Sequence, residues 1–424
     1  MRYQRLINTC LFCIMATIAM AQTSSNSPYT RYGLGELSDQ HFGNSKAMGG
    51  IAYGLRNGLQ VNAANPASYT AIDSLTFIFD AGLSLQNTNF KENGVSTNAK
   101  NSSIDYIAMQ FRLNKRMGMA MGFLPYSNVG YNMTQVNTIN KDEYGAVIES
   151  YHNYQGTGGL QQVFAGLGYK VFNNLSIGAN FSYLYGDITH STMTSFSNTN
   201  AFSSVRTHQI SISSYKLDLG LQYTQKFGEK HVVNLGAAYS HGHEMNSEGY
   251  YYTETYDNNS TLQTHSGDTI SNAFSLPNTF GVGMTYVYNN SLTVGLDYTL
   301  QKWSDCKYYN KKGQYTDRRK ISLGAEYIPN LRGRRYMDFM RYRIGFHYAE
   351  PYAKVNGQEG AREYGASVGL GLPIFAFRGR SILNISGQYV KVSPKVKGML
   401  EENYLRLNIG LTFNERWFMK YKVE

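Results

Sequence analysis

Most of this chain alternates between apolar and polar residues with a period of two. Between Leu175 and Tyr185 every second residue is apolar. The positions between them carry Ser176, Gly178, Asn180 and Ser182, with Leu184 as the one apolar exception. Because a β-strand places successive side chains on opposite faces, this pattern predicts strands with one apolar and one polar face.

The same pattern recurs along the chain. Its apolar stripes fall in 75–85, 117–123, 163–171, 215–223, 233–239, 280–288, 292–300, 321–327, 342–348, 364–374, 383–385 and 405–413. Many runs are about 9–11 residues long, which is the length a tilted strand needs to cross a bilayer. Tyr often occupies their ends, as in the aromatic girdles of membrane barrels. The pattern predicts an all-β fold, a transmembrane antiparallel β-barrel of about 14 strands.

The links between the runs differ in length. Short turns are expected at 172–174 and 289–290, and long loops at 86–103, 188–208, 242–275 and 304–317. Short turns facing the periplasm and long loops facing outward are typical of outer-membrane barrels. We expect a turn at 414–416, a final outward stripe at 417–423, and pairing of the last strand with the first.

A soluble β-sandwich also alternates, because each strand hides one face in a core. The number of strands, the Gly-, Ser- and Asn-rich second face and an export signal favour the membrane instead. Lipid offers backbone groups no hydrogen bonds, so a sheet within it must close on itself.

The export signal occupies residues 1–21, which we interpret as a signal peptide. Arg2 and Arg5 precede the apolar stretch Leu6–Met20, and cleavage is expected after Ala21. The Cys10-x-x-Cys13 motif falls inside this peptide, which leaves Cys306 without an internal disulfide partner. Export and the barrel together predict the outer membrane of a Gram-negative bacterium.

Composition supports these predictions. Charged residues make up 16% of the 424-residue chain, against about 25% in soluble domains. An aromatic content of 14% is too high for a disordered chain. The formal net charge of +10 includes a cluster at Arg332, Arg334 and Arg335. For an exported chain, lipid phosphates or loop solvation explain this charge better than nucleic acid, which we exclude as a partner.

Residues 22–73 do not alternate. Gly43–Gly58 is rich in glycine and includes a short helix expected at 46–55, and Asn65-Pro66 predicts a turn. A barrel of about 14 strands is wide enough to need a plug. We therefore divide the mature chain into an N-terminal hatch at 22–73 and a transmembrane barrel at 74–424.

Several motifs occur in a recognisable order. They are Gly43–Ala52 with Asn65-Pro66-Ala67, Leu276–Gly283, Asp297-Tyr298 before Trp303-Ser304, and Leu323–Tyr327 before Arg343-Ile344-Gly345. This ordered set resembles the long-chain fatty-acid transporter (FadL/TodX-type) family of outer-membrane proteins. The opening Ser27–Glu36 is similar to a Bacteroidota branch of that group. No such motif occurs in 128–275.

The resemblance implies a 14-stranded barrel with an N-terminal hatch. In that family, hydrophobic ligands pass from an outer pocket through the hatch and leave sideways into the membrane. We therefore expect passive transport of fatty-acid-like small molecules, with such a ligand and outer-membrane lipid as partners. The residues expected to form the gate are Gly49, Gly50, Asn65 and Pro66. The residues expected to contact ligand, or alternatively only to pack the plug, are Phe42, Met48, Ile51 and Leu55.

Three inward-facing arginines add charge to the predicted lumen: Arg341, Arg343 and Arg406. They either attract an anionic head group or pair with the acidic residues Asp80, Asp218, Asp297 and Glu326. The second alternative is the simpler one. The Gly365–Gly369 stretch matches G-x-S-x-G, but that motif requires a strand-to-helix turn and Ser367 falls mid-strand. His241-Gly242-His243-Glu244 lacks the fixed ligands of a zinc site. We therefore expect no enzyme activity, metal or cofactor.

A second function remains open. A barrel of this type is also compatible with a non-transport subunit that docks protein-export or envelope-assembly partners. The Tyr-rich stretch with Tyr250, Tyr251, Tyr252 and Tyr256 suits such a surface, since Tyr is enriched at protein interfaces.

Overall fold

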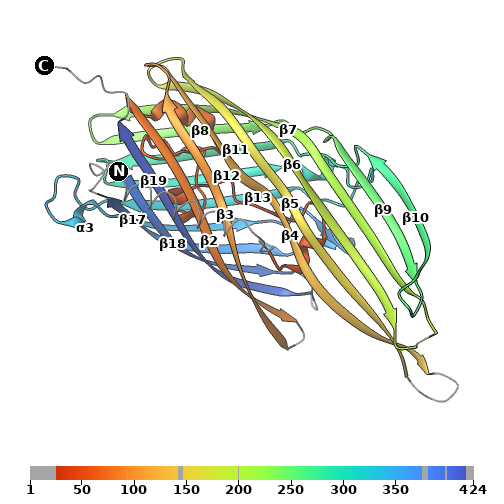
Figure 1. Ribbon diagram of the computed structural model, residues 1–424. Coiled ribbons are helices and arrows are strands. Elements are labelled where there is room, and N and C mark those ends of the chain that lie inside the picture. Colours follow the sequence, from red (N-terminus) through yellow and green to blue (C-terminus); the bar gives the residue numbers. More distant parts are fainter. Residues whose placement is uncertain are drawn as a thin grey trace, which may run out of the picture.

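A closed ring of 14 antiparallel strands forms the body of the molecule (Figure 1). The computed structural model describes residues 25–416, apart from 93, 142–146, 199, 375–380 and 397–398. The predicted signal peptide and the stripe at 417–423 lie outside these residues. In ring order the strands are β2 Thr76–Glu92, β3 Val95–Arg112, β4 Met117–Lys141, β5 Val147–Lys170, β6 Leu175–Phe196, β7 Ser203–Phe227, β8 His231–Ser240, β11 Thr279–Tyr288, β12 Leu292–Gln301, β13 Arg318–Tyr327, β14 Arg341–Ala349, β17 Arg362–Ile374, β18 Ser381–Ser393 and β19 Glu401–Arg416.

The ring closes where the last strand meets the first. Strands β19 and β2 pair from Glu401↔Lys91 to Arg416↔Thr76. This confirms the predicted closed barrel, although the strand that pairs with β2 is β19, whereas the sequence predicts a further closing strand after it. The turn predicted at 414–416 is wrong, because these residues continue β19 and pair with 76–78.

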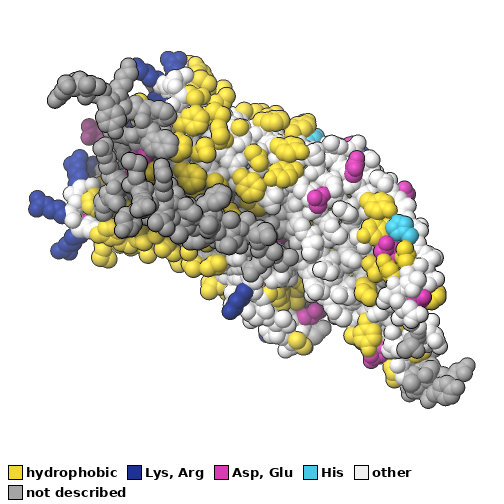
Figure 2. Space-filling view, in the orientation of Figure 1, with side chains coloured by type: hydrophobic (Ala, Val, Ile, Leu, Met, Phe, Trp, Pro, Cys, Tyr) yellow, Lys and Arg dark blue, Asp and Glu magenta, His cyan; other side chains and the backbone are white. Residues whose placement is uncertain are grey.

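An apolar band surrounds the ring. Strands β8, β11, β12 and β13 have 10 residues each, so a tilted strand of this kind covers a band about 25 Å tall. Outward side chains such as Leu219, Val282 and Leu323 are 44%, 53% and 46% exposed. Figure 2 shows such side chains gathered over the ring. No helix in the described part of the chain is both long and apolar enough to span a membrane.

Four strands extend far beyond this band. Strands β4, β5, β6 and β7 contain 25, 24, 22 and 25 residues. The hairpin of β9 (Ser247–Tyr256) and β10 (Leu262–Ser271) adds to their outer ends. The loops predicted at 86–103 and 188–208 are therefore largely strand. Beyond the lipid the outward face of these strands no longer needs apolar residues, so the period-two signal weakens although the backbone pairing continues.

The extended strands identify the two ends of the barrel. Their extended ends lie opposite the short turns after β3, β5 and β11, whereas the connection 328–340, which carries α3 (Tyr336–Phe339), lies at the end with the short turns. By the usual orientation of such barrels, the short turns face the periplasm and the extended sheet faces outward.

A mouth cluster of buried side chains lies under the extended sheet. Gly158, Gly159 and Gly186 have positive φ angles of 111°, 144° and 148°, and they let β5 and β6 bend inward. The mouth cluster consists of Leu34, Tyr126, Val129, Tyr131, Leu160, Leu184, Ile188, Ile210, Ile212, Met245, Ala273, Phe274, Leu276, Trp303, Cys306, Tyr315 and Tyr352. Trp303 begins the 3-10 helix η3 (Trp303–Asp305). Apolar packing thus fills the outer mouth of the barrel.

Residues 25–73, the N-terminal segment, lie inside the ring. Their elements are η1 Pro28–Arg31, β1 Glu36–Leu37, α2 Gly43–Ala47 and η2 Pro66–Ala71. Helix α2 contacts β14, β17, β18 and β19, while η2 contacts β4 to β7 on other parts of the wall. A segment that touches so many strands of a closed ring occupies its lumen.

The remaining elements lie in loops. They are α3 Tyr336–Phe339, β15 Lys354–Val355 and β16 Gln358–Glu359. The helix predicted at 46–55 is shorter and earlier than expected. The observed helix, α2, ends at Ala47, because Gly49 and Gly50 adopt φ angles of 66° and 86°, which a continuing helix does not allow.

Candidate functional site

Gly49 lies directly against the barrel wall. A Cβ added to Gly49 would stand 2.5 Å from the carbonyl oxygen of Phe346. The wall residues that face this turn are glycines as well. A Cβ on Gly324 would meet the Met48 oxygen at 2.3 Å, and one on Gly345 would meet the Gly49 nitrogen at 2.0 Å. Gly50 faces His41 and the amine of Lys320 rather than wall backbone. Backbone therefore packs on backbone between this turn and strands β13 and β14.

Strand side chains hold the same turn by hydrogen bonds. Asp297 on β12 accepts from the amides of Ala52 and Tyr53 at 2.6 and 2.8 Å. Ser367 on β17 donates to the Ala47 oxygen at 3.0 Å and accepts from the Gly49 amide at 3.1 Å. Sequence reasoning missed both roles. The only available signal was a polar residue at an inward position, and that does not reveal a partner more than 200 residues away.

Asn65 and Pro66 form a second attachment to the wall. The Asn65 side chain accepts from the Ala67 amide at 3.2 Å and donates to the Tyr53 oxygen at 2.8 Å, so it caps η2. Cβ atoms on Gly178 and Gly220 would meet Pro66 carbon and Asn65 Oδ1 at 2.4 and 2.2 Å. Three of the four residues expected to form the gate, Gly49, Asn65 and Pro66, thus lie at the places where the segment touches the wall.

The residues expected to contact ligand lie within the packing of the segment. Phe42, Met48, Ile51 and Leu55 are 2%, 1%, 0% and 7% exposed. The Phe42 ring stacks on Tyr106 with centroids 4.1 Å apart. None of the four lines either of the two main cavities of the described chain.

The three lumen arginines have acidic neighbours. Arg343 and Arg341 contact Glu326 at 2.7 and 3.1 Å. Arg406 hydrogen-bonds to Gln86 at 2.6 Å and lies 3.5 Å from Glu36. Of the three, only Arg406 lines the larger cavity.

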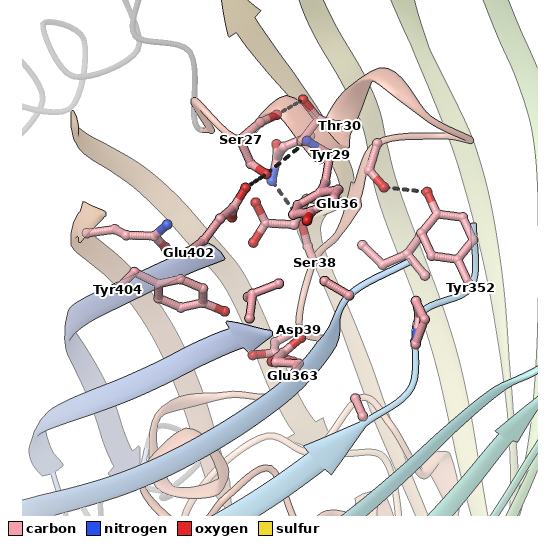
Figure 3. A pocket seen from close by; sticks show the side chains of 18 of the residues that line it. Ser27, Tyr29, Thr30, Glu36, Ser38, Asp39, Tyr352, Glu363, Glu402 and Tyr404 are labelled. Carbon is pink, nitrogen blue, oxygen red and sulfur yellow. Dashed lines mark hydrogen bonds between the residues drawn. The ribbon is translucent and has the colours of Figure 1, made fainter. Parts of the chain in front are cut away.

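The larger cavity has a volume of about 180 Å³ and lies between the N-terminal segment and the wall (Figure 3). We call it the seam cavity, because it lies behind a gap in the pairing of β3 with β4. Its lining combines charged residues such as Glu36, Asp39 and Arg406 with apolar groups, including Pro125, Tyr352 and Val355. Ser27 donates to Glu402 across it at 2.5 Å. Burial raises the pKa of Glu36, although Arg406 opposes this effect. Burial also opposes ionisation of Asp39, but Lys320, His41 and Arg406 hold the pKa of Asp39 well below its usual range.

A smaller cavity of about 130 Å³ adjoins the first. The two share Leu37, Ser38, Asp39 and Arg318 in their linings, so the chain around β1 separates them. The smaller cavity also has charged side chains, including Lys216 and Asp218.

The wall beside the seam cavity is incomplete. Strands β3 and β4 pair only from Ile107↔Phe123 to Arg112↔Gly118, which is the half of the wall next to the short turns. Beyond that, β3 stays with β2, whereas β4 stays with β5 and passes through an irregularity after Pro125. Proline has no amide to donate to a ladder. Figure 1 shows the β2–β3 and β4–β5 hairpins diverging. We call this interval the β3–β4 seam.

The N-terminal segment covers the seam from inside. Its β1 pairs with β4 as Glu36↔Asn128 and Leu37↔Ser127. On the other side, Asn26 donates to Asn101 of β3 at 2.6 Å. The seam cavity lies behind this cover, because it is lined by Asn101–Ser103 of β3 and by Pro125 and Asn128 of β4.

A family model described as BamG matches residues 4–424. The chain belongs to the BamG family. No curated protein matches this BamG-family chain. Solved structures share its fold. The CymD monoaromatic hydrocarbon channel has a TM-score of 0.59 and 15% identity, covering 90% of this chain and 98% of CymD. The toluene transporter TbuX of Ralstonia pickettii has a TM-score of 0.59 and 16% identity, covering 88% of this chain and 98% of TbuX.

A FadL homologue from Pseudomonas aeruginosa gives a TM-score of 0.56 and 14% identity, covering 90% of this chain and 98% of that one. The fold of the expected transporter group is thereby confirmed for this BamG-family barrel. The expected Bacteroidota branch and the fatty-acid ligand stay predictions.

Proposed function

We propose that this barrel lies in the outer membrane of a Gram-negative bacterium and passes amphiphilic small molecules, such as fatty acids, sideways through the β3–β4 seam. The observation that carries the proposal is a gap in the wall ladder with a cavity directly behind it. A complete barrel wall would offer no lateral route. The hydrocarbon and toluene channels that share the fold support a hydrophobic cargo.

The polarity of the cavity points to a cargo with a head group. A pure hydrocarbon would gain little from a cavity lined by Glu36, Asp39 and Arg406. An amphiphile would place its polar head among these groups while its tail enters the seam and the lipid beyond. Lys46, Arg318 and Arg406 are the cationic residues of this lining that an anionic head could meet.

The N-terminal segment acts as the gate in this proposal. It must leave β4 before a ligand can cross the seam, and a ligand that binds the displaced form better shifts the population toward it. Gly49, Asn65 and Pro66 anchor the rest of the segment to the wall, and Gly50 belongs to the same turn, so movement is confined to residues 25–41. Phe42, Met48, Ile51 and Leu55 would become ligand contacts only if the movement reaches α2.

A cross-link across the gate tests the proposal. In a Cys306→Ser background, Leu37→Cys and Ser127→Cys occupy paired positions on β1 and β4. Oxidation should reduce uptake of labelled long-chain fatty acid by cells at least tenfold, and a reductant should restore it. The matched control is Phe227→Cys with His231→Cys, a pair between β7 and β8 outside the segment. Uptake that is equally fast with the gate cross-linked would refute lateral passage through the seam.

A second role, docking of export or envelope-assembly partners, is favoured by the filled mouth. The mouth cluster closes the outer end with buried side chains, which is unfavourable for an intake of solutes there. The partly exposed tyrosines of β9 suit a protein-binding surface instead. Purification in mild detergent separates the roles. Stoichiometric protein partners would support docking, whereas bound lipid alone would support transport.

A further inference from the structure

The extended sheet ends in an unpaired strand. Outside the membrane band, β9 pairs with the outer half of β7, and β10 pairs with β9. Among the described residues no further strand forms a ladder on the other side of β10. In Figure 1 this hairpin lies at the end of the molecule farthest from the short turns. An edge strand presents a row of free amide and carbonyl groups to other chains.

The hydrogen bonds reveal which backbone groups face outward. The amide of Asn272, which directly follows β10, donates to the Ser247 oxygen. The backbone amide and carbonyl groups of even-numbered β10 residues therefore point toward β9. On the far side of β9, the Ser213 amide donates to the Asn246 oxygen, which agrees with the same alternation. The Thr269 amide instead donates to the Asp268 carboxylate beside it, at 2.8 Å. Odd-numbered residues of β10, including His265, Gly267 and Thr269, therefore direct their backbone groups to the open edge.

Little in the sequence of β10 blocks this edge, although Asp268 accepts from the outward Thr269 amide and the register shifts between Leu262 and Thr264. Natural edge strands are usually protected by Lys, Pro or a bulge that turns them away. Residues 262–271 contain neither Lys nor Pro. Every residue of β10 except Ile270 is exposed, and the register is regular from Thr264 to Ser271.

The charge of the hairpin indicates the chemistry of a partner. Residues 247–271 carry Glu248, Glu254, Asp257 and Asp268 and contain no Lys or Arg. Tyr250, Tyr251, Tyr252 and Tyr256 of β9 lie among these carboxylates. Figure 2 shows acidic side chains toward this end, while Lys and Arg lie mainly at the opposite end. A basic segment would therefore be attracted, and Arg in it would find Tyr rings to stack on.

A second copy of the chain fits this edge poorly. Two barrels in one membrane share the same up-and-down orientation, so their β10 strands would run in the same direction. Every described pairing in the sheet is antiparallel. A flexible segment of another protein has no such constraint and can run antiparallel to β10.

We propose that β10 is a docking edge to which a basic, extended segment of a partner protein adds as a further antiparallel strand. Main-chain hydrogen bonds at the odd-numbered positions would give affinity, and the carboxylates of the hairpin would select the basic partner. The inference deepens the docking role proposed above and is independent of passage through the seam.

Proline at position 265 tests the backbone part of the proposal. His265→Pro removes one outward amide and leaves the ladder to β9 intact. His265→Ala removes the same side chain, with its contacts to Glu254 and Tyr250, and keeps the amide. A fluorescein-labelled ten-residue peptide that alternates Lys with Thr and Val is titrated against the full chain in detergent. We expect similar affinity for the unaltered chain and His265→Ala, and at least tenfold weaker binding for His265→Pro. Equal binding by the two variants would overturn strand addition.

The same peptide with Glu in place of Lys tests the charge part. It should bind at least tenfold more weakly, and binding of the Lys peptide should fall as salt is raised. Equal binding of both peptides would overturn the choice of a basic partner. Heat-dependent gel mobility of each variant checks that its barrel is folded.

A photo-cross-linker at Gln263 tests the proposal in native membranes. Cross-links that map to a Lys- or Arg-rich segment of another protein, and that disappear in His265→Pro but not in His265→Ala, would support it. Cross-links to a second copy, or only to lipid, would overturn it. Uptake of labelled fatty acid is measured in the same cells. Unchanged uptake in His265→Pro leaves the seam proposal standing whichever result the cross-linker gives.

Discussion

At the scale of single residues, Gly49 has the strictest environment in the N-terminal segment. Its φ of 66° and its contact with the Phe346 oxygen both exclude a side chain. We expect Gly49→Ala to weaken the docked segment by about 1–3 kcal/mol. Trypsin should then cleave faster after Lys46, which is only 4% exposed in the docked form. The cleavage rate of the folded barrel measures the effect.

Gly228→Ala is the matched control for this substitution. Gly228 has a nearly identical φ of 64°, but nothing lies within 4 Å of an added Cβ. It should leave cleavage after Lys46 unchanged. Equal protection of Gly49→Ala and the unaltered chain would mean that the close approach at Gly49 does not hold the segment.

Asp297 gives a second prediction at this scale. Its Oδ2 oxygen accepts from two segment amides, and Asn at this position offers only a neutral oxygen, so the charge-assisted part of both hydrogen bonds is lost. Asp297→Asn should destabilise the docked segment by about 1–3 kcal/mol. Urea-induced release, followed by a fluorophore on the segment, should shift to lower urea. Asp305→Asn, on an exposed loop, should not shift it. A shift of the same size in both variants would contradict the proposed anchor.

At the scale of elements, the β9–β10 hairpin is separable from the barrel. Strand β8 pairs directly with β11 from Thr279↔Ser240 to Tyr288↔His231, so the ring does not need the hairpin to close. Replacing 247–271 by a short Gly-Ser linker should leave the heat-dependent gel mobility of a folded barrel. Loss of that mobility, at expression equal to the unaltered chain, would show that the hairpin is required for folding.

The sequence predicted the membrane-embedded elements well, because lipid on one side and lumen on the other impose a strict period of two. Beyond the lipid this constraint ends, so the pattern predicts a loop at 188–208 where the structure has the outer parts of β6 and β7. The site was predictable in part. Gly49-Gly50 and Asn65-Pro66 carry local backbone signals, whereas the partnership of Ser367 with Ala47 and Gly49 depends on folding of the whole ring.

At the scale of the whole molecule, the apolar band should make the protein dependent on an amphiphile. Outward residues such as Leu405 and Phe181 are 59% and 61% exposed. We expect the purified chain to be monodisperse in detergent and to aggregate when detergent is removed into plain buffer. Light scattering during removal measures this. A monodisperse chain without amphiphile would contradict the membrane interpretation.

The β3–β4 seam also makes the ring mechanically uneven. Six register pairs join β3 to β4, from Ile107 to Arg112, whereas sixteen join β19 to β2, from Glu401 to Arg416. Under load, the first hairpin should therefore stay attached to the last strands of the chain, and the ring should tear along its short border with β4. In a pulling experiment, the barrel would be tethered through the β2–β3 and β5–β6 connections. The first rupture should separate β4 from β3 while β19 and β2 remain paired. The first strands of the barrel should therefore behave under load as one unit with the last strand, β19.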